Sequence, residues 1–207
     1  IGNRPGQRRV SCQQQGGDVS RLGQPAAVAF QKLRSGKHLF LTPGVYQLAK
    51  LYQAHIIGDN FWVWRADHGS GVGWEKNRAA NGIFVAGDDI TIYALMVEHF
   101  QEYQTVWEGE NGKIIFYQSE IPYDVPNQER WRSHDGKVNG YASIKAADDV
   151  RTHESWGLGI YLYNRDAEVE LHSAMEAPEN TEAVWFHNIC TVMITGKPGM
   201  SHIINED

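Results

Sequence analysis

A short pattern recurs along the chain, in which a polar turn containing Asp or Asn separates two runs of apolar, β-branched or aromatic residues. Its polar anchors are Asn60, Asp89, Asn111, Asp149 and Asn188. Successive anchors lie 29, 22, 38 and 39 residues apart. A spacing of about 20 to 50 residues indicates a solenoid, because one repeat alone cannot bury its apolar face. The pattern therefore predicts an all-β chain, a parallel β-helix whose unit is strand, polar turn, strand.

One repeat shows the physical basis of this prediction. The strand-forming runs 83–85 and 90–92 flank Gly87-Asp88-Asp89, which supplies turn chemistry. Asp and Asn tolerate the left-handed backbone that a sharp corner needs, and stacked copies can hydrogen-bond along the solenoid. We expect all five anchors on one edge and Ile90, Ile92, Ile114, Phe116 and Val150 in one core. An antiparallel β-sandwich is the alternative, and the insertion-free 22-residue step favours the solenoid.

The rest of the chain divides into segments around these repeats. Residues 1–24 read as a flexible leader, and residues 25–207 as the β-helix domain. Within that domain, 25–33 predicts a short N-terminal capping helix, and 37–48 predicts a first strand, Pro-Gly turn and strand. The longer steps indicate loops over 122–140 and 164–182, the second of which could instead be an extra irregular coil.

Composition restricts the partners. The 207 residues carry a net charge of −6, and no segment has the length and apolarity of a membrane span. Nucleic acids and anionic membranes require a basic face, so we expect neither as a partner. Cys12 and Cys190 are the only cysteines, and their number is compatible with two thiols or one disulfide.

Several stretches resemble a known group of proteins. Leu39 to Tyr46 looks like the first coil of pectate-lyase-like, right-handed parallel β-helix proteins. The stretches 59–69, 97–100, 122–126 and 152–159 are more specific. They resemble microbial secreted β-helix proteins that are similar to family 55 glycoside hydrolases, the β-1,3-glucanase-like group. The resemblance implies a right-handed β-helix, secretion and a polysaccharide substrate. The chain departs from the group between residues 49 and 58, where further coils are expected.

Aromatic side chains are the first candidates for binding a glycan, because flat rings stack on sugar faces. Among the seven Trp residues, Trp74 and Trp131 stand in Gly/Asn-rich or charged loops and are expected to be exposed. The full set predicted to bind substrate is Trp64, Trp74, Trp131, Trp156, Arg65, His99 and His153. The alternative is that half or more of the Trp rings fill the core.

Carboxylates are the candidates for catalysis. Glu98 is nine residues past Asp89, and Glu120 is nine past Asn111, so both occupy the same station on adjacent coils. Two such carboxylates cannot both ionise freely, which gives an acid and a base for glycoside cleavage. Asp67 and Glu154 lie on flanking coils and complete the predicted catalytic set, while an outward, inert polar ladder is the alternative.

A metal centre is not predicted. His68, His99 and His153 could form a three-His site, but the chain has no HExxH, no close His-x-His and no DxDxDG loop. We therefore expect no cofactor, with Ca²⁺ as the one ion left open.

The leading hypothesis is thus a secreted glycoside hydrolase that acts on a β-glucan-like polysaccharide through paired carboxylates. A Ca²⁺-assisted polysaccharide lyase is the second, with Arg65 or, behind it, Lys113 as the base. A non-catalytic carbohydrate-binding or structural solenoid is the third.

Overall fold

The computed structural model describes residues 51–179, 181, 183–195 and 198–206, together with two short strands nearer the N-terminus. The chain divides into two units, Ile1–Leu48 and Ala49–Asp207. In the first unit, β1 (Arg9–Ser11) pairs in parallel with β2 (His38–Phe40). Strand β2 confirms one predicted strand, whereas the predicted helix at 25–33 and the turn and strand at 43–48 lie outside the described residues. The domain boundaries stay a prediction.

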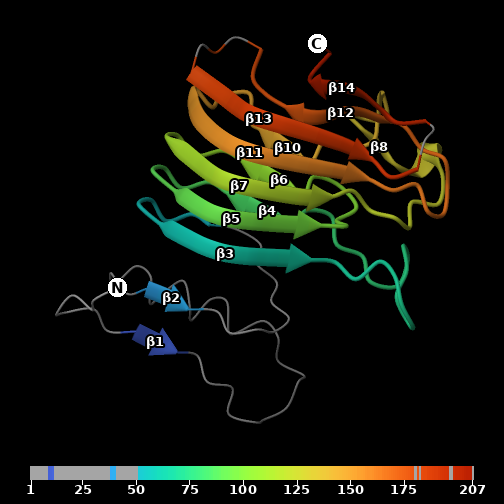
Figure 1. Ribbon diagram of the computed structural model, residues 1–207, viewed down its shortest axis with the longest axis horizontal. Helices are drawn as coiled ribbons and strands as arrows, with labels where there is room; N and C mark the ends of the chain where they lie inside the picture. Colours follow the sequence, from blue (N-terminus) through green and yellow to red (C-terminus); the bar gives the residue numbers. More distant parts are fainter. Residues whose placement is uncertain are drawn as a thin grey trace. The chain divides into compact units, whose positions relative to one another are not determined.

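The second unit is built from two five-stranded parallel sheets (Figure 1). Neighbouring strands within each sheet are parallel, so the antiparallel sandwich is wrong for this unit. The sheet in front in Figure 1, here the front sheet, consists of β3 (Ile57–Trp64), β5 (Thr91–Glu98), β7 (Gly112–Glu120), β11 (Thr152–Leu162) and β13 (Ala183–Met193). The back sheet consists of β4 (Ile83–Val85), β6 (Thr105–Trp107), β10 (Ile144–Ala146), β12 (Leu171–Glu176) and β14 (Met200–Ile204).

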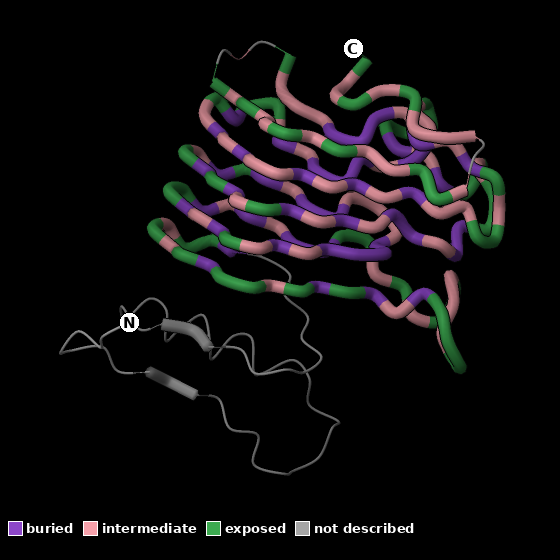
Figure 2. Tube along the Cα trace, viewed as in Figure 1, coloured by how far each residue is buried: buried purple, intermediate pink, exposed green. Residues whose placement is uncertain are grey.

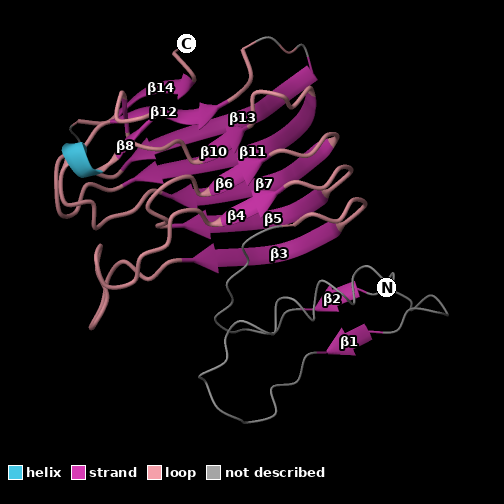
Figure 3. Ribbon diagram, turned by 180° about the vertical axis from the view of Figure 1, so that it is seen from behind, coloured by secondary structure: helices cyan, strands magenta, loops and turns pink. Residues whose placement is uncertain are grey.

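The chain alternates between the two sheets and advances by one strand at each return (Figure 3). The interruption after β7 contains the short 3-10 helix η1 (Gln128–Arg130) and the antiparallel pair β8 (Arg132–Ser133) and β9 (Val138–Asn139). The predicted second loop contains β12, so the extra-coil alternative describes it better. Over the residues that the structure describes, no helix is long and apolar enough to cross a membrane.

The core lies between the two sheets, where alternate residues of the front strands point inward (Figure 2). Tyr117 of β7 is fully buried, and its hydroxyl lies 3.1 Å from the Thr105 Oγ1 of β6 and 2.9 Å from the Ser143 Oγ. This polar bridge within the core joins the two sheets. It also satisfies a phenol that would otherwise be costly to bury.

A column of left-handed residues crosses the middle of the front sheet, at one position in each strand. Its members have φ between 52° and 67°: Asn60, Ala94, Phe116, Gly157 and Asn188. The strand registers skip these positions on both sides, so each is a stacked bend. Each bend shifts the inward–outward alternation by one residue. In β7, Ile114 points inward before the bend and Tyr117 and Ser119 point inward after it.

The bends correct one prediction about the core. Ile90, Ile92, Ile114 and Val150 are buried as expected, but Phe116 is 57% exposed. Phe116 is two residues after Ile114, and regular strand alternation places two such residues on the same face. The sequence pattern therefore predicted that Phe116 points inward. Its own left-handed backbone, with φ at 66°, turns the ring to solvent.

The five polar anchors do not share one edge, so that part of the prediction is wrong. Asn60 and Asn188 belong to the mid-strand column, whereas Asp89 and Asn111 occupy the turns before β5 and β7 with left-handed backbones of their own. There the Asn111 Nδ2 donates to the Asp89 Oδ1 at 3.2 Å, which confirms the expected hydrogen bond between stacked turns. Asp149 does not have a left-handed backbone, so it belongs to neither of these two sets.

Candidate functional site

Glu98 and Glu120 are register partners at the ends of β5 and β7. Neighbouring strands lie about 4.8 Å apart, so the two side chains leave the sheet next to each other. The bends at Ala94 and Phe116 give both residues their outward direction, because without the shift in alternation their parity would point them into the core. The predicted neighbouring placement of the two carboxylates is confirmed.

Each of the two carboxylates has hydrogen-bond donors of its own. The Trp62 indole Nε1 donates to the Glu98 Oε2 at 2.8 Å. The Tyr123 hydroxyl donates to the Glu120 Oε2, and the Gln118 Nε2 donates to the Glu120 Oε1 at 3.2 Å. Burial raises the pKa of Glu98, the Trp62 hydrogen bond opposes this, and the negative charge of Glu120 raises it further. Glu98 therefore holds a proton more readily than an exposed glutamate.

Aromatic rings form a wall beside the acids. Trp62 and Trp64 are 67% and 46% exposed and stack with their ring centroids 6.3 Å apart. They stand two residues apart on β3, so both point out of the sheet. Trp64 is the register partner of Glu98, which places this exposed aromatic surface directly next to the acid pair.

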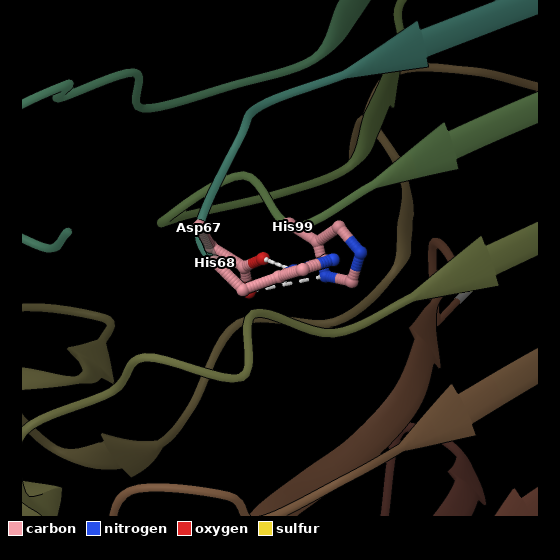
Figure 4. Close-up of side chains that lie close together, drawn as sticks. All are labelled: Asp67, His68 and His99. Carbon is pink, nitrogen blue, oxygen red and sulfur yellow. Dashed lines mark hydrogen bonds and ion pairs between the residues drawn. The ribbon is translucent and has the colours of Figure 1, made fainter. Parts of the chain in front are cut away.

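Asp67, His68 and His99 form a compact cluster (Figure 4). The Asp67 carboxylate lies 2.5 Å from the His68 Nδ1 and 3.3 Å from the His99 Nδ1. On its other side, the His99 Nε2 is 3.7 Å from the Glu120 Oε2. Adjacent residues of a strand point to opposite faces, but the left-handed backbone of His99, with φ at 67°, makes a bend directly after Glu98. That bend brings both residues to one site.

Arg65 holds this arrangement from beneath. Its Nε donates to the His99 carbonyl at 2.5 Å and its Nη2 donates to the Asp124 Oδ1. Arg65 and Asp124 are each only 4% exposed. Burial raises the pKa of Asp124, although the Arg65 hydrogen bond and charge act against this. Direct substrate contact by Arg65 was predicted, and the structure contradicts it because the guanidinium is buried and paired.

Two other predicted residues lie inside the protein and not at the site. His153 is 2% exposed, packs edge-on against Trp107 with ring centroids 4.7 Å apart, and has its Nε2 2.7 Å from the Ser155 Oγ. Trp131 is fully buried, and its Nε1 donates to the Gln101 carbonyl at 3.1 Å. The predictions that His153 binds substrate and that Trp131 is exposed are therefore wrong. A three-His centre is excluded too, since His153 faces the core.

Glu154 and Trp156 are on the outer face of the front sheet but far from the acids. The register partner of Glu120 on β11 is Tyr161, seven residues beyond Glu154. At about 3.3 Å per residue, Glu154 lies roughly 20 Å from the pair. Trp156 lies between Glu154 and Tyr161 on β11, and its ring stacks on His187 with the ring centroids 5.3 Å apart. The structure therefore does not bring Glu154 into the same site.

Trp74 is half-buried, and the centre of its ring lies 5.7 Å from the Arg65 Cζ. This cation–π contact holds Trp74 near the cluster of Asp67, His68 and His99. One concave surface lies away from this cluster. A groove of about 580 Å³ runs over the starts of β5, β7 and β11, with Thr91, Lys113 and Glu154 among its lining residues. It is at the opposite ends of the strands from Glu98 and Glu120. At Glu98 and Glu120, by contrast, charge, an exposed aromatic surface and hydrogen bonds converge.

The sequence reading missed Trp62 and Tyr123. Trp62 could have been found, because strand alternation places it on the same face as Trp64. Tyr123 follows the end of β7, and burial together with its hydrogen bond to Glu120 raises the pKa of its hydroxyl. Its backbone N–H also donates to the Asp67 Oδ2 at 2.7 Å.

Comparison with known proteins agrees with the fold. Residues 49–120 match the family described as LAM55 pectate lyase-like domain. Over 151 residues, 72% of the chain, the sequence is 46% identical to an exo-beta-1,3-glucanase of Streptomyces sp. strain SirexAA-E / ActE. The aligned region is 24% of that relative, so the chain spans about a quarter of its length.

Two solved structures are also similar. The structure of sacteLam55A from Streptomyces sp. SirexAA-E superposes with a TM-score of 0.71 at 44% identity, over 76% of this chain and 28% of that one. A variant of sacteLam55A in complex with glucose gives a TM-score of 0.67 at 44% identity, over 72% and 27%. The resemblance to pectate-lyase-like proteins similar to family 55 glycoside hydrolases is confirmed, and the chain is a relative of these LAM55-type proteins.

Proposed function

We propose that this chain carries the acid–base pair of a secreted glycoside hydrolase that cleaves a β-1,3-glucan-type polysaccharide. The observation that carries the proposal is the register pairing of Glu98 with Glu120 beside an exposed Trp62–Trp64 wall. The comparisons add the substrate class, because one relative is named an exo-beta-1,3-glucanase and a variant of sacteLam55A was solved in complex with glucose. Secretion is part of the same proposal, since the chain resembles secreted β-helix proteins.

The proposed architecture is a right-handed parallel β-helix. Alternation of the chain between two parallel sheets, with one strand gained per return, supports it. A solved relative with a TM-score of 0.71 agrees with it. The capping helix at 25–33 remains part of this proposal.

In the proposed reaction, one carboxyl protonates the glycosidic oxygen and the other carboxylate activates water or attacks the sugar. Burial and the negative charge of Glu120 raise the pKa of Glu98, which favours Glu98 as the carboxyl that donates the proton. Tyr123 and Gln118 hold Glu120 in place, and Trp62 holds Glu98. No cofactor enters this chemistry.

The lyase alternative is weaker on structural grounds. A lyase base must reach the substrate, but Arg65 is buried against Asp124, and Lys113 is at the start of β7, away from the acids. Ca²⁺ prefers an all-oxygen site, whereas the candidate cluster beside the acids contains two imidazoles.

Product analysis on laminarin-type β-1,3-glucan tests the proposal. A hydrolase releases new reducing ends without ultraviolet absorbance, whereas a lyase releases an unsaturated, absorbing product. Binding without either product supports the non-catalytic alternative. Synthetic glucosides with a good leaving group then separate the roles, because cleavage of such a bond needs little help from a general acid. The variant that retains activity on these substrates identifies the acid.

A further inference from the structure

Asp67, His68 and His99 have the composition of a metal site. Each offers one ligand atom, and these three atoms lie within 4.8 Å of one another. Figure 4 shows both imidazoles next to the Asp67 carboxylate, which comes from the segment after β3, while His99 follows β5. Two chain segments thus converge on one carboxylate with two nitrogen donors.

An independent observation shows that the cluster is incomplete as a hydrogen-bonded unit. The His99 Nδ1 is buried and has no hydrogen-bond partner. Its 3.3 Å contact with Asp67 is an ion-pair distance and not a well-formed hydrogen bond. A buried nitrogen without a partner is costly, and an ion bound between Nδ1 and the carboxylate would satisfy it.

The spacing suits a tetrahedral ion. Bonds of about 2.0 to 2.1 Å at tetrahedral angles place two ligand atoms about 3.3 Å apart. The Asp67–His99 pair already has this separation, at 3.3 Å. The Asp67–His68 pair is closer, at 2.5 Å, and the His68 side chain is 50% exposed, so it can move outward.

The second ring nitrogen of His99 has a carboxylate on its side, as that of many metal-binding histidines does. The His99 Nε2 lies 3.7 Å from the Glu120 Oε2, an ion-pair distance that is too long for a hydrogen bond. Asp67 is held as well, because its Oδ2 accepts the Tyr123 backbone N–H at 2.7 Å.

We propose that Asp67, His68 and His99 bind one divalent transition-metal ion of the Zn²⁺ class. Imidazole nitrogens with one carboxylate suit Zn²⁺, Co²⁺ or Ni²⁺, whereas Ca²⁺ and Mg²⁺ require oxygen ligands.

Occupancy of this site affects the acid pair. The ion is coordinated by His99, whose Nε2 lies 3.7 Å from the Glu120 Oε2. Metal binding therefore places a positive charge near one carboxylate of the acid pair. Reversible inhibition by Zn²⁺ follows, and this consequence rests on the proposed glycosidase function. Metal binding itself does not depend on that function.

Calorimetric titration of the full chain with ZnCl₂ tests the site, using a Cys12→Ser/Cys190→Ser background because thiols also bind Zn²⁺. We expect one tight site per chain and no comparable site for CaCl₂. His68→Gln should weaken binding at least tenfold, since it removes one of three ligands from an exposed position. Asp67→Asn should weaken it further. The matched control is His202→Gln, because His202 and His172 form another His pair with ring centroids 4.8 Å apart.

The outcomes separate the two proposals. Unchanged Zn²⁺ affinity in His68→Gln, loss of affinity in His202→Gln, or no binding at millimolar Zn²⁺ overturns the metal site. Tight binding lost with His68→Gln supports it whether or not the chain hydrolyses glucan. Where hydrolysis is detected, it should fall on addition of Zn²⁺ and return with EDTA. A Zn²⁺-insensitive enzyme with the site filled overturns the inhibitory coupling alone.

Discussion

Glu98 and Glu120 face each other across β5 and β7 because a 22-residue step separates two turns with the same backbone geometry. Asp89 and Asn111 start the two repeats, and both repeats contain one left-handed bend before the acid. Each carboxylate is nine residues past its turn and follows one bend, so the two residues are in register on neighbouring strands. The candidate site is thus a product of repeat symmetry, because the same outward position carries a carboxylate on both strands.

Glu98→Gln and Glu120→Gln should each lower glucan hydrolysis by at least about a hundredfold, since general acid–base catalysis typically contributes that much. Glu154→Gln is the control, because it removes a similar carboxylate roughly 20 Å away along the sheet. Initial rates of reducing-end release, with circular dichroism to verify folding, measure the effect. Full activity in both variants would remove the acid pair from the mechanism.

Trp62→Ala and Trp64→Ala should each weaken glucan binding by about 1 to 3 kcal/mol, because each deletes an exposed stacking ring beside the acids. Trp185→Ala is the matched control, since Trp185 is 54% exposed but is near the start of β13. Affinity electrophoresis or calorimetry on a catalytically inactive Gln variant measures the change. Equal losses at Trp185 would contradict a glycan surface localised at the acid pair.

The repeat spacing and the acid pair could be predicted from the sequence, because turn residues and β-branched runs are read locally. The mid-strand bends could not be predicted in full. Ala94 and Phe116 adopt left-handed backbones that their side chains do not favour, so nothing in their identity announces a bend. The register of the neighbouring strands imposes the conformation, which is a tertiary effect.

The misplacement of His153 follows from one of the same bends. Leu158, Ile160 and Leu162 face the core, and uninterrupted alternation would then put His153 outside. The bend at Gly157 reverses this parity, so His153 faces inward. Trp131 was misplaced for another reason, since loop composition does not reveal that a distant carbonyl, that of Gln101, accepts its indole N–H.

His153 should make stability depend on pH below neutrality. Burial lowers its pKa from 6.5 to about 4, so the folded state resists a proton that the unfolded state accepts. Stability is therefore fully present above about pH 6.5 and falls as the pH decreases to about 4. The loss is on the order of 3 kcal/mol, from about 1.4 kcal/mol per pKa unit. Urea denaturation at several pH values should show a flatter profile for His153→Gln, with His187→Gln as the control.

Gly157→Ala should destabilise the fold by about 1 to 2 kcal/mol, the cost of a left-handed backbone for an L side chain. The cause is conformational and not steric, because an added Cβ would meet only the Phe116 Cα at 3.9 Å. Gly157→Asn should therefore cost less than Gly157→Ala, since Asn tolerates this conformation and already occupies positions 60 and 188 of the column. Equal losses for the two substitutions, measured by chemical denaturation, would point to packing instead.

Arg65→Met should destabilise the protein by about 3 to 5 kcal/mol, because it leaves the buried Asp124 carboxylate without its partner. The double variant Arg65→Met/Asp124→Leu should recover much of this loss, since a buried ion pair and an apolar pair of similar volume are often comparable in stability. Activity should not recover with it, because the Arg65 Nε also holds the His99 carbonyl, and His99 faces Glu120. Denaturation and glucan hydrolysis measured on the wild type and both variants separate the two effects. Recovery of both stability and turnover in the double variant would show that Arg65 serves the fold alone.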